Sequence, residues 1–158
     1  MARAAYITTD IWIDDGFREM SKDEKLVWMY LITSPLSNIA GFFKLPPTYI
    51  EVAIDKESAN ILQSPCKMWK YDADTKQVLL TNFLKHNTPK SSSQMKAVAK
   101  QVQSLDRCGL LVDFMFSVYK YCSPEIFEYF DKRFMDYIRT EAKLRNDRVG
   151  TIVSNIDI

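Results

Sequence analysis

The stretch SKDEKLVWMYLITSPLSNIAGFFKL, residues 21–45, decides the fold that the sequence predicts. It opens with Ser21 and Glu24 at the spacing of a capping box, in which the serine oxygen accepts the backbone N–H of the glutamate and the glutamate side chain reaches back. The run from Leu26 to Ile32 is almost wholly apolar, so we expect a central core helix enclosed by other elements. A turn containing proline, asparagine and glycine then leads to a short extended segment that starts at Phe42.

Two short helices and a hairpin are predicted to follow this stretch. Thr48 and Glu51 repeat the capping-box spacing directly after two prolines, which indicates a short helix. Asp55 can cap a third helix, whose end near Pro65 the sequence leaves open. Residues 69–81, WKYDADTKQVLLT, have the pattern of a hairpin with a turn rich in aspartate. Helix, strand, two helices and hairpin is the order of a winged helix.

The rest of the chain predicts amphipathic helices. A helix from Gln94 to Leu105 carries one apolar stripe, and its opposite side is basic and rich in amides. A second stripe consists of Leu111, Phe114, Met115, Val118 and Tyr119, and a third, after a Ser123-Pro124 cap, consists of Ile126, Phe127, Phe130, Phe134 and Tyr137 or Ile138.

The predicted fold class is therefore mainly α with a small β-hairpin, a winged helix-turn-helix followed by additional amphipathic helices. We assign residues 1–88 to the winged-helix domain and residues 89–146 to a helical extension, in which a basic helix at 94–105 precedes two amphipathic helices. Residues 147–158 carry no clear period and are predicted to be a frayed tail.

Composition narrows the class of protein. The 158 residues are 47% hydrophobic, which is ample for a core, and 21 Lys and Arg balance 20 Asp and Glu, so bulk charge gives no argument for nucleic acid. Three widely spaced cysteines fit neither a disulfide framework nor a zinc site. Because the sequence shows neither a signal peptide nor a membrane-spanning run, we expect a cytoplasmic protein without a membrane partner, in the host cytoplasm if a phage encodes it.

No combination of residues predicts catalysis. The chain has one histidine, His86, whose neighbours offer no ligand spacing, and its four glycines are isolated, so none forms a phosphate-binding loop. We expect a protein that is not an enzyme and that uses no metal or cofactor.

Local charge is the positive signal. From Lys85 to Lys100 the sequence has lysines and amides but no acidic residue, and such a segment suits phosphate contacts that release counterions. Asn and Gln on the third helix are suited to reading adenine, although they also serve as ordinary surface polar groups. The candidate DNA-binding residues are Lys56, Ser58, Asn60, Gln63, Lys67, Lys70, Lys76, Lys90, Lys96 and Lys100. The alternative interpretation of the lysines is a solvated helix face.

Three segments carry a resemblance to a known family: SKDEKL at the first helix, SNIAGFF at residues 37–43 and NFLKHN at residues 82–87. With their surroundings, about residues 7–104, they resemble the N-terminal winged-helix domain of phage replication initiators, the replisome organisers of Gram-positive phages related to the DnaD group. The resemblance implies a winged helix that binds origin DNA and recruits the host machinery that loads helicase. It therefore implies a role in initiating phage DNA replication.

Two functions of different classes follow. The first is a non-enzymatic protein that contacts double-stranded DNA through the third helix, the wing and the following basic helix. The second is a winged-helix adaptor or oligomerisation module that recruits helicase or its loader and binds little DNA itself, since fold alone does not decide function. The adaptor predicts exposed aromatic residues on the C-terminal helices, among Phe114, Phe116, Tyr121, Phe127, Tyr129 and Phe134.

Overall fold

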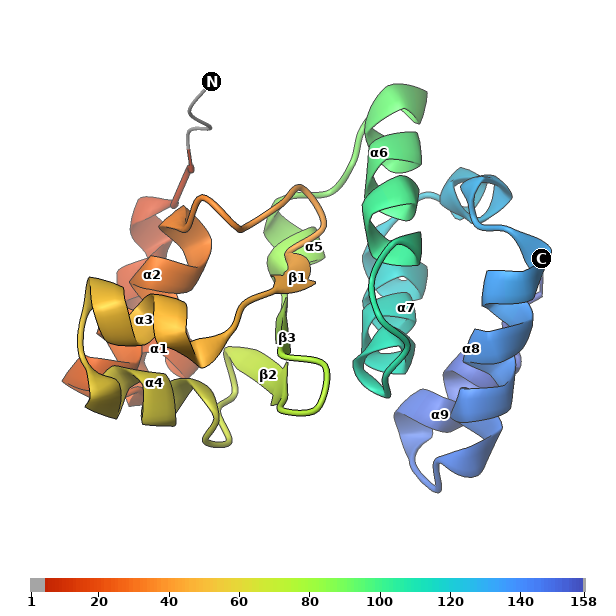
Figure 1. Ribbon diagram of the computed structural model, residues 1–158. Helices are drawn as coiled ribbons and strands as arrows, with labels where there is room; N and C mark the ends of the chain where they lie inside the picture. The colour runs from red at the N-terminus through yellow and green to blue at the C-terminus, as the bar shows by residue number, and fades with distance from the viewer. Residues whose placement is uncertain (1–4, 158) are drawn as a thin grey trace. The chain divides into compact units, whose positions relative to one another are not determined.

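The computed structural model describes residues 5–157, which fall into two compact units, one up to Thr81 and one from Asn82 (Figure 1). We call them unit 1 and unit 2 and describe each by itself. The division lies several residues before the predicted boundary after residue 88. The reason is a short helix, α5 (Phe83–His86), which packs against helix α7 (Leu110–Tyr121) of unit 2.

Unit 1 has the predicted order of elements and a three-stranded antiparallel sheet. Strand β3 lies between β1 and β2, and all four of its residues are buried. Its Val78 is opposite Phe43 of β1 and Tyr71 of β2. The elements are η1 (Thr9–Ile13), α1 (Asp15–Glu19), α2 (Lys22–Thr33), β1 (Phe42–Lys44), α3 (Pro47–Ala53), α4 (Lys56–Leu62), β2 (Trp69–Asp72) and β3 (Gln77–Leu80).

Helix α2 begins as the sequence predicts, because Ser21 Oγ accepts the backbone N–H of Glu24 at 3.1 Å. Val27, Trp28 and Leu31 form its buried face, which includes the side that α4 contacts. The prediction that other elements enclose the helix is wrong, since Leu26 and Met29 are 48% and 39% exposed. The apolar run therefore supplies both a core face and an exposed apolar flank.

The turn between α2 and β1 is organised by one asparagine. The Asn38 side chain accepts the backbone N–H of Ala40 at 3.0 Å and donates to the carbonyl of Phe42 at 2.7 Å. Gly41 adopts a left-handed conformation with φ of 67°, which a side chain would strain. These contacts deliver two phenylalanines, Phe42 and Phe43, fully into the core.

The helices α3 and α4 form where predicted, with one difference in capping. Helix α3 starts at Pro47, so Thr48 lies inside its first turn and the expected capping box does not start the helix. The Asp55 cap of α4 is confirmed by a 2.7 Å bond from the backbone N–H of Ser58. Helix α4 ends at Leu62, before Pro65.

Unit 2 is helical, and α7 is its core helix. Leu111, Val112, Phe114, Met115 and Val118 of α7 are fully buried, and α7 contacts α5, α8 and α9. The elements are α5, α6 (Ser92–Gln103), α7, η2 (Pro124–Tyr129), α8 (Lys132–Leu144) and α9 (Arg148–Ser154). No helix in the described part of the chain is long and apolar enough to cross a membrane.

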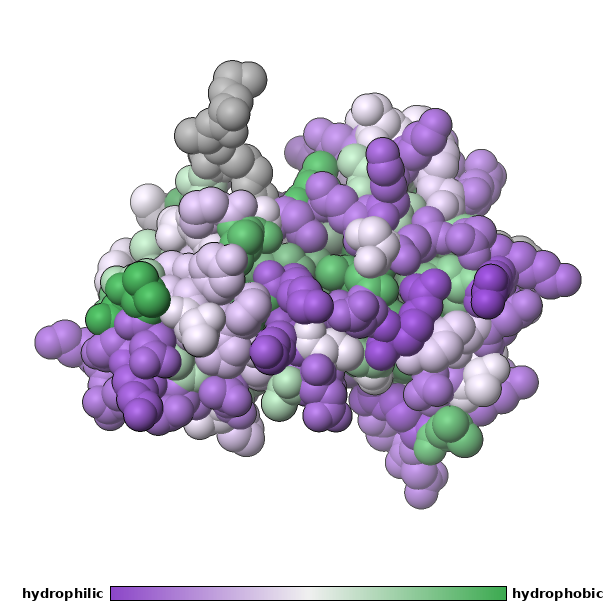
Figure 2. All heavy atoms as spheres, viewed as in Figure 1, coloured by the Kyte–Doolittle hydropathy of each residue, from purple (hydrophilic) through white to green (hydrophobic). Residues whose placement is uncertain are grey.

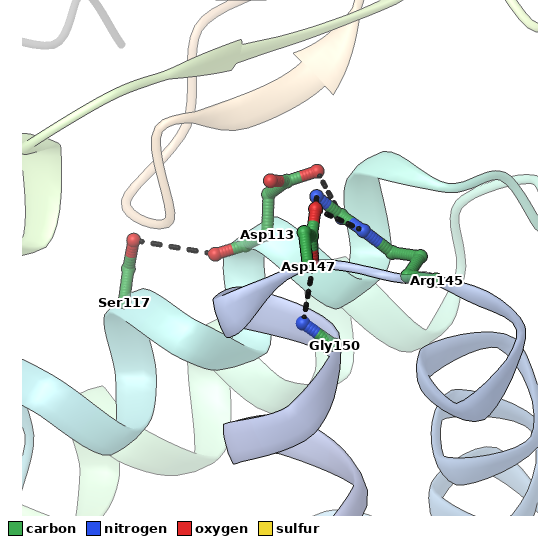
Figure 3. Close-up of polar contacts among 5 residues, drawn as sticks. All are labelled: Asp113, Ser117, Arg145, Asp147 and Gly150. Carbon is green, nitrogen blue, oxygen red and sulfur yellow. Dashed lines mark hydrogen bonds and ion pairs between the residues drawn. The ribbon is translucent and has the colours of Figure 1, made fainter.

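Two predictions for unit 2 are wrong. The single helix expected after Ser123 is two elements, because Asp131 caps a new helix by accepting the backbone N–H of Phe134 at 2.7 Å. The residues expected to fray form α9, whose cap Asp147 accepts the backbone N–H of Gly150. Arg145 joins Asp147 to Asp113 of α7, at 2.7 and 2.9 Å, and so fixes this corner (Figure 3).

Candidate nucleic-acid interface

Helix α4, the predicted reader of base edges, presents fewer reading side chains than the sequence indicates. Ser58 is only 3% exposed, and its hydroxyl and backbone N–H both bond to Asp55, which lowers the pKa of that carboxyl. The buried Ser58 side chain offers no exposed group to DNA in this structure, which counts against its assignment as a DNA-binding residue. Asn60 and Gln63 are exposed, but the Gln63 amide nitrogen donates to the carbonyl of Ala59 at 3.2 Å.

The surface beside α4 is acidic. A hollow of about 310 Å³ lies between the start of α2 and the end of α4, with Trp69 and Ile61 among its walls. Three carboxylates line this hollow, those of Asp23, Glu24 and Glu57, and among residues 5–157 no lysine or arginine does. Phosphates approaching this side of α4 would meet repulsion.

The lysines of the hairpin and of the segment before it are partly compensated. Lys67 pairs with Glu19, and the hydrogen bond and charge of that carboxylate raise the pKa of Lys67. Lys70 and Lys76 are exposed, but the same hairpin carries two aspartates, at 72 and 74. Lys76 also has a left-handed backbone with φ of 56°, while its carbonyl accepts the backbone N–H of Leu45 at 2.7 Å.

The two units differ in net charge. Residues 1–81 contain nine Lys and Arg against eleven Asp and Glu, a net charge of −2. Residues 82–158 contain twelve against nine, a net charge of +3. The near-neutral net charge of the whole chain is therefore the sum of a negative unit 1 and a positive unit 2. The positive excess lies outside the winged-helix-like unit.

Unit 2 contains the segment with the most favourable charge for phosphate, defined by Lys85, Lys90, Lys96 and Lys100. We call it the basic segment. All four side chains are exposed, and the sequence has no acidic residue from 82 to 105. The lysines of this segment are thus exposed as the prediction requires, whereas Lys56, Lys67, Lys70 and Lys76 belong to unit 1.

Hydrogen bonds hold the basic segment in a fixed backbone conformation. Thr88 Oγ1 donates to the carbonyl of Leu84 at 2.6 Å, and Pro89 is buried. Ser91 caps α6 through its hydroxyl, and the Gln94 side chain accepts the backbone N–H of Lys90 at 2.7 Å. Lys90 is thereby attached to the first turn of α6.

Helix α6 presents Lys96 and Lys100 one turn apart on its exposed side, away from the buried stripe. That stripe is Met95, Val98, Ala99 and Val102, so the predicted apolar face is confirmed, with Leu105 half-buried beyond its end. Gln103 fixes the helix to η2 and α8, since its amide donates to the carbonyl of Tyr129 at 3.1 Å and accepts the backbone N–H of Asp131 at 2.8 Å.

Most aromatic residues expected to be exposed on unit 2 are not. Phe114, Phe127 and Phe134 are buried, and Phe116, Tyr121 and Tyr129 are half-buried. Most of the exposed large apolar side chains among the described residues lie instead in unit 1, and Figure 2 shows a hydrophobic patch over α3. They are Tyr6, Trp12, Ile13, Leu26, Met29, Leu36, Tyr49 and Val52. Trp12 and Ile13 are among the most exposed of these, at 69% and 71%.

The remaining groups with chemical potential are unactivated or isolated. Burial raises the pKa of the Cys66 thiol and raises that of Cys122 to about 11, so both thiols stay protonated at neutral pH. His86 is exposed at the end of α5. Among residues 5–157 no cluster of His, Cys, Asp and Glu could hold a metal ion.

Comparison of the chain with protein-family models, with characterised proteins and with solved structures found no match. The resemblance to phage replication initiators thus stands on the sequence segments alone.

Proposed function

We propose that this protein is a non-enzymatic DNA-binding protein that acts in the initiation of phage DNA replication. The basic segment of unit 2 makes its main contacts with double-stranded DNA, and Lys56, Asn60, Gln63, Lys70 and Lys76 of unit 1 add weaker ones. The process is inferred from the resemblance of residues 7–104 to replication initiators. The DNA contact is inferred from charge and exposure.

The observation that carries the proposal is the segregation of charge. Four exposed lysines lie in a segment without an acidic residue, in a unit whose net charge is +3. Each phosphate that a lysine neutralises releases counterions from the duplex, which supplies affinity that does not depend on sequence. Because Lys96 and Lys100 lie one turn apart on α6, we expect both to contact the backbone of one strand.

The proposal is tested with the variant Lys96→Glu/Lys100→Glu in the full chain. Fluorescence anisotropy with labelled duplexes of several sequences should show weaker binding to all of them. The slope of log affinity against log salt should fall by about two, because two phosphate contacts are lost.

Lys132→Glu/Lys143→Glu is the matched control, because both lysines are exposed on α8 and the change in net charge is identical. This control should bind more tightly than the α6 variant and keep the wild-type salt slope. Equal losses of duplex affinity in the two variants would show that net charge alone, and not the position of Lys96 and Lys100, determines binding. Unchanged binding in the α6 variant would contradict the proposal.

A second candidate function is favoured by one observation, the exposed apolar side chains of unit 1. In this candidate the protein is an adaptor that self-associates or contacts helicase or its loader. Trp12 is 69% exposed and packs edge-on against Phe17, and Ile13 beside it is 71% exposed. Exposed apolar surface of this kind is typical of protein-contact sites.

Light scattering distinguishes this candidate. If the adaptor is the main function, the wild-type chain forms oligomers, or binds a purified helicase loader, and Trp12→Ala/Ile13→Ala loses that association while duplex binding stays intact. A monomer that binds duplex DNA but no loader would exclude it.

A further inference from the structure

We infer that the last turn of α7, with Tyr119 and Lys120, is a contact site for single-stranded DNA. This inference deepens the proposed function by naming a second form of the same ligand and the residues that would hold it. It rests on the proposed function for the class of ligand, and on the exposure, ring contacts and charge of this turn for the site.

Tyr119 is exposed, although the other apolar residues of its predicted stripe on α7 are buried. The stripe of α7 predicts that Tyr119 is buried with Leu111, Phe114, Met115 and Val118, which are fully buried. Tyr119 is instead 54% exposed, although Val118 beside it is not. An aromatic ring on a rigid helix loses little conformational freedom when a base stacks on it, and such stacking tolerates any base.

Lys120 supplies the charge for a neighbouring phosphate. Its ammonium lies 5.1 Å from the ring centre of Tyr121 and 6.0 Å from that of Phe116, so two rings hold the cation at the surface. The sequence has no acidic residue from 114 to 124, and the exposed Glu125 that follows accepts a hydrogen bond from Ser92. The carbonyl end of a helix repels phosphate, so the contact depends on this lysine.

The turn belongs to the same end of unit 2 as the start of α6. Ser92 Oγ donates to Glu125 Oε1 at 3.2 Å, which joins α6 to η2, the element that directly follows α7 (Figure 1). The expected path of a strand therefore leads from Lys96 past the exposed Glu125 to Lys120 and the ring of Tyr119. Alternating cations and rings is the arrangement that binds single strands without sequence preference.

The experiment uses the full chain and labelled oligo-deoxythymidine beside a duplex. Tyr119→Ala should weaken single-strand binding about fivefold or more, the range expected for the loss of one stacked base. Tyr119→Phe keeps the ring and should retain affinity, whereas Lys120→Met should weaken it and reduce its salt dependence. Duplex binding should follow Lys96 and Lys100 and be unaffected by Tyr119→Ala.

Tyr49→Ala is the matched control, because Tyr49 is a similarly exposed tyrosine, at 50%, in unit 1. It should leave single-strand binding unchanged. The inference is overturned if the wild-type chain does not bind the oligonucleotide, or if Tyr119→Ala binds it as the wild type does, or if Tyr49→Ala weakens it equally. Those results would leave the duplex proposal standing. A wild-type chain that binds the oligonucleotide but no duplex would instead contradict the proposed function and not this site.

Discussion

At the residue scale, Lys76 stands where the backbone favours glycine. Its φ of 56° lies in the left-handed region, which costs a side-chain-bearing residue about 1–2 kcal/mol, while glycine costs about 0.5–1 kcal/mol through the unfolded chain. Lys76→Gly should therefore raise the free energy of unfolding by about 0.5 kcal/mol in urea titrations. Lys76→Ala removes the same charge but keeps the strained backbone, so it should not stabilise; an equal gain in both variants would contradict the strain argument.

Gly150 is required by a close approach of backbone. A β-carbon at this position would lie 2.6 Å from both the carbonyl oxygen of Ala142 and the β-carbon of Arg145. Gly150→Ala should therefore displace α9 and lower the free energy of unfolding by about 2 kcal/mol, a typical cost of overpacking.

Gly109→Ala is the control, because nothing lies within 4 Å of a β-carbon there. It should leave stability unchanged or slightly higher. Equal stability of the two alanine variants in chemical denaturation would show that the contact at Gly150 is absent in solution.

At the scale of elements, one hydroxyl joins the hairpin to the end of the first strand. Tyr71 of β2 donates to the carbonyl of Leu45 at 3.1 Å, and burial, with a contribution from Asp72, raises the pKa of Tyr71 to about 12. The protonated phenol is favoured in the folded state, so this stability is present below pH 10 and is lost as pH rises toward 12.

Tyr71→Phe should therefore destabilise the protein by about 1 kcal/mol at neutral pH, the worth of one hydrogen bond. The difference from wild type should shrink as pH rises through the alkaline window, measured by denaturation at a series of pH values. Tyr49→Phe, on the exposed surface of α3, should show no such trend. A difference that stays constant with pH would contradict the role of the phenol.

At the scale of the whole molecule, the opposite net charges of the two units predict unequal contributions to DNA binding. Lys56→Glu/Lys76→Glu should weaken duplex binding less than Lys96→Glu/Lys100→Glu, because unit 1 already carries −2 and three carboxylates, including Glu57 of α4, line the hollow beside that helix. Salt-dependent anisotropy gives the ranking. Equal or larger losses from the unit 1 variant would place the main interface on the winged-helix-like unit.

Local sequence determined most of the elements of this protein. The Ser21 cap, the Asp55 cap, the two-strand hairpin and the stripes of α6 and α7 depend on interactions between near neighbours, which are legible without the fold. The concentration of lysines before and within α6 is of the same kind. These features gave the fold class and the basic segment.

Three features depend on tertiary structure and could not be predicted from the sequence: the burial of Ser58, the pairing of Lys67 with Glu19, and the formation of helix α9 by residues expected to fray. Each depends on a contact or packing that no periodicity contains, such as the one between Arg145 and Asp113, 32 positions apart. The first helix shows the same limit: its apolar run predicted enclosure, but only the neighbours that pack on α2 determine which apolar side chains are covered and which, as Leu26 and Met29, stay exposed.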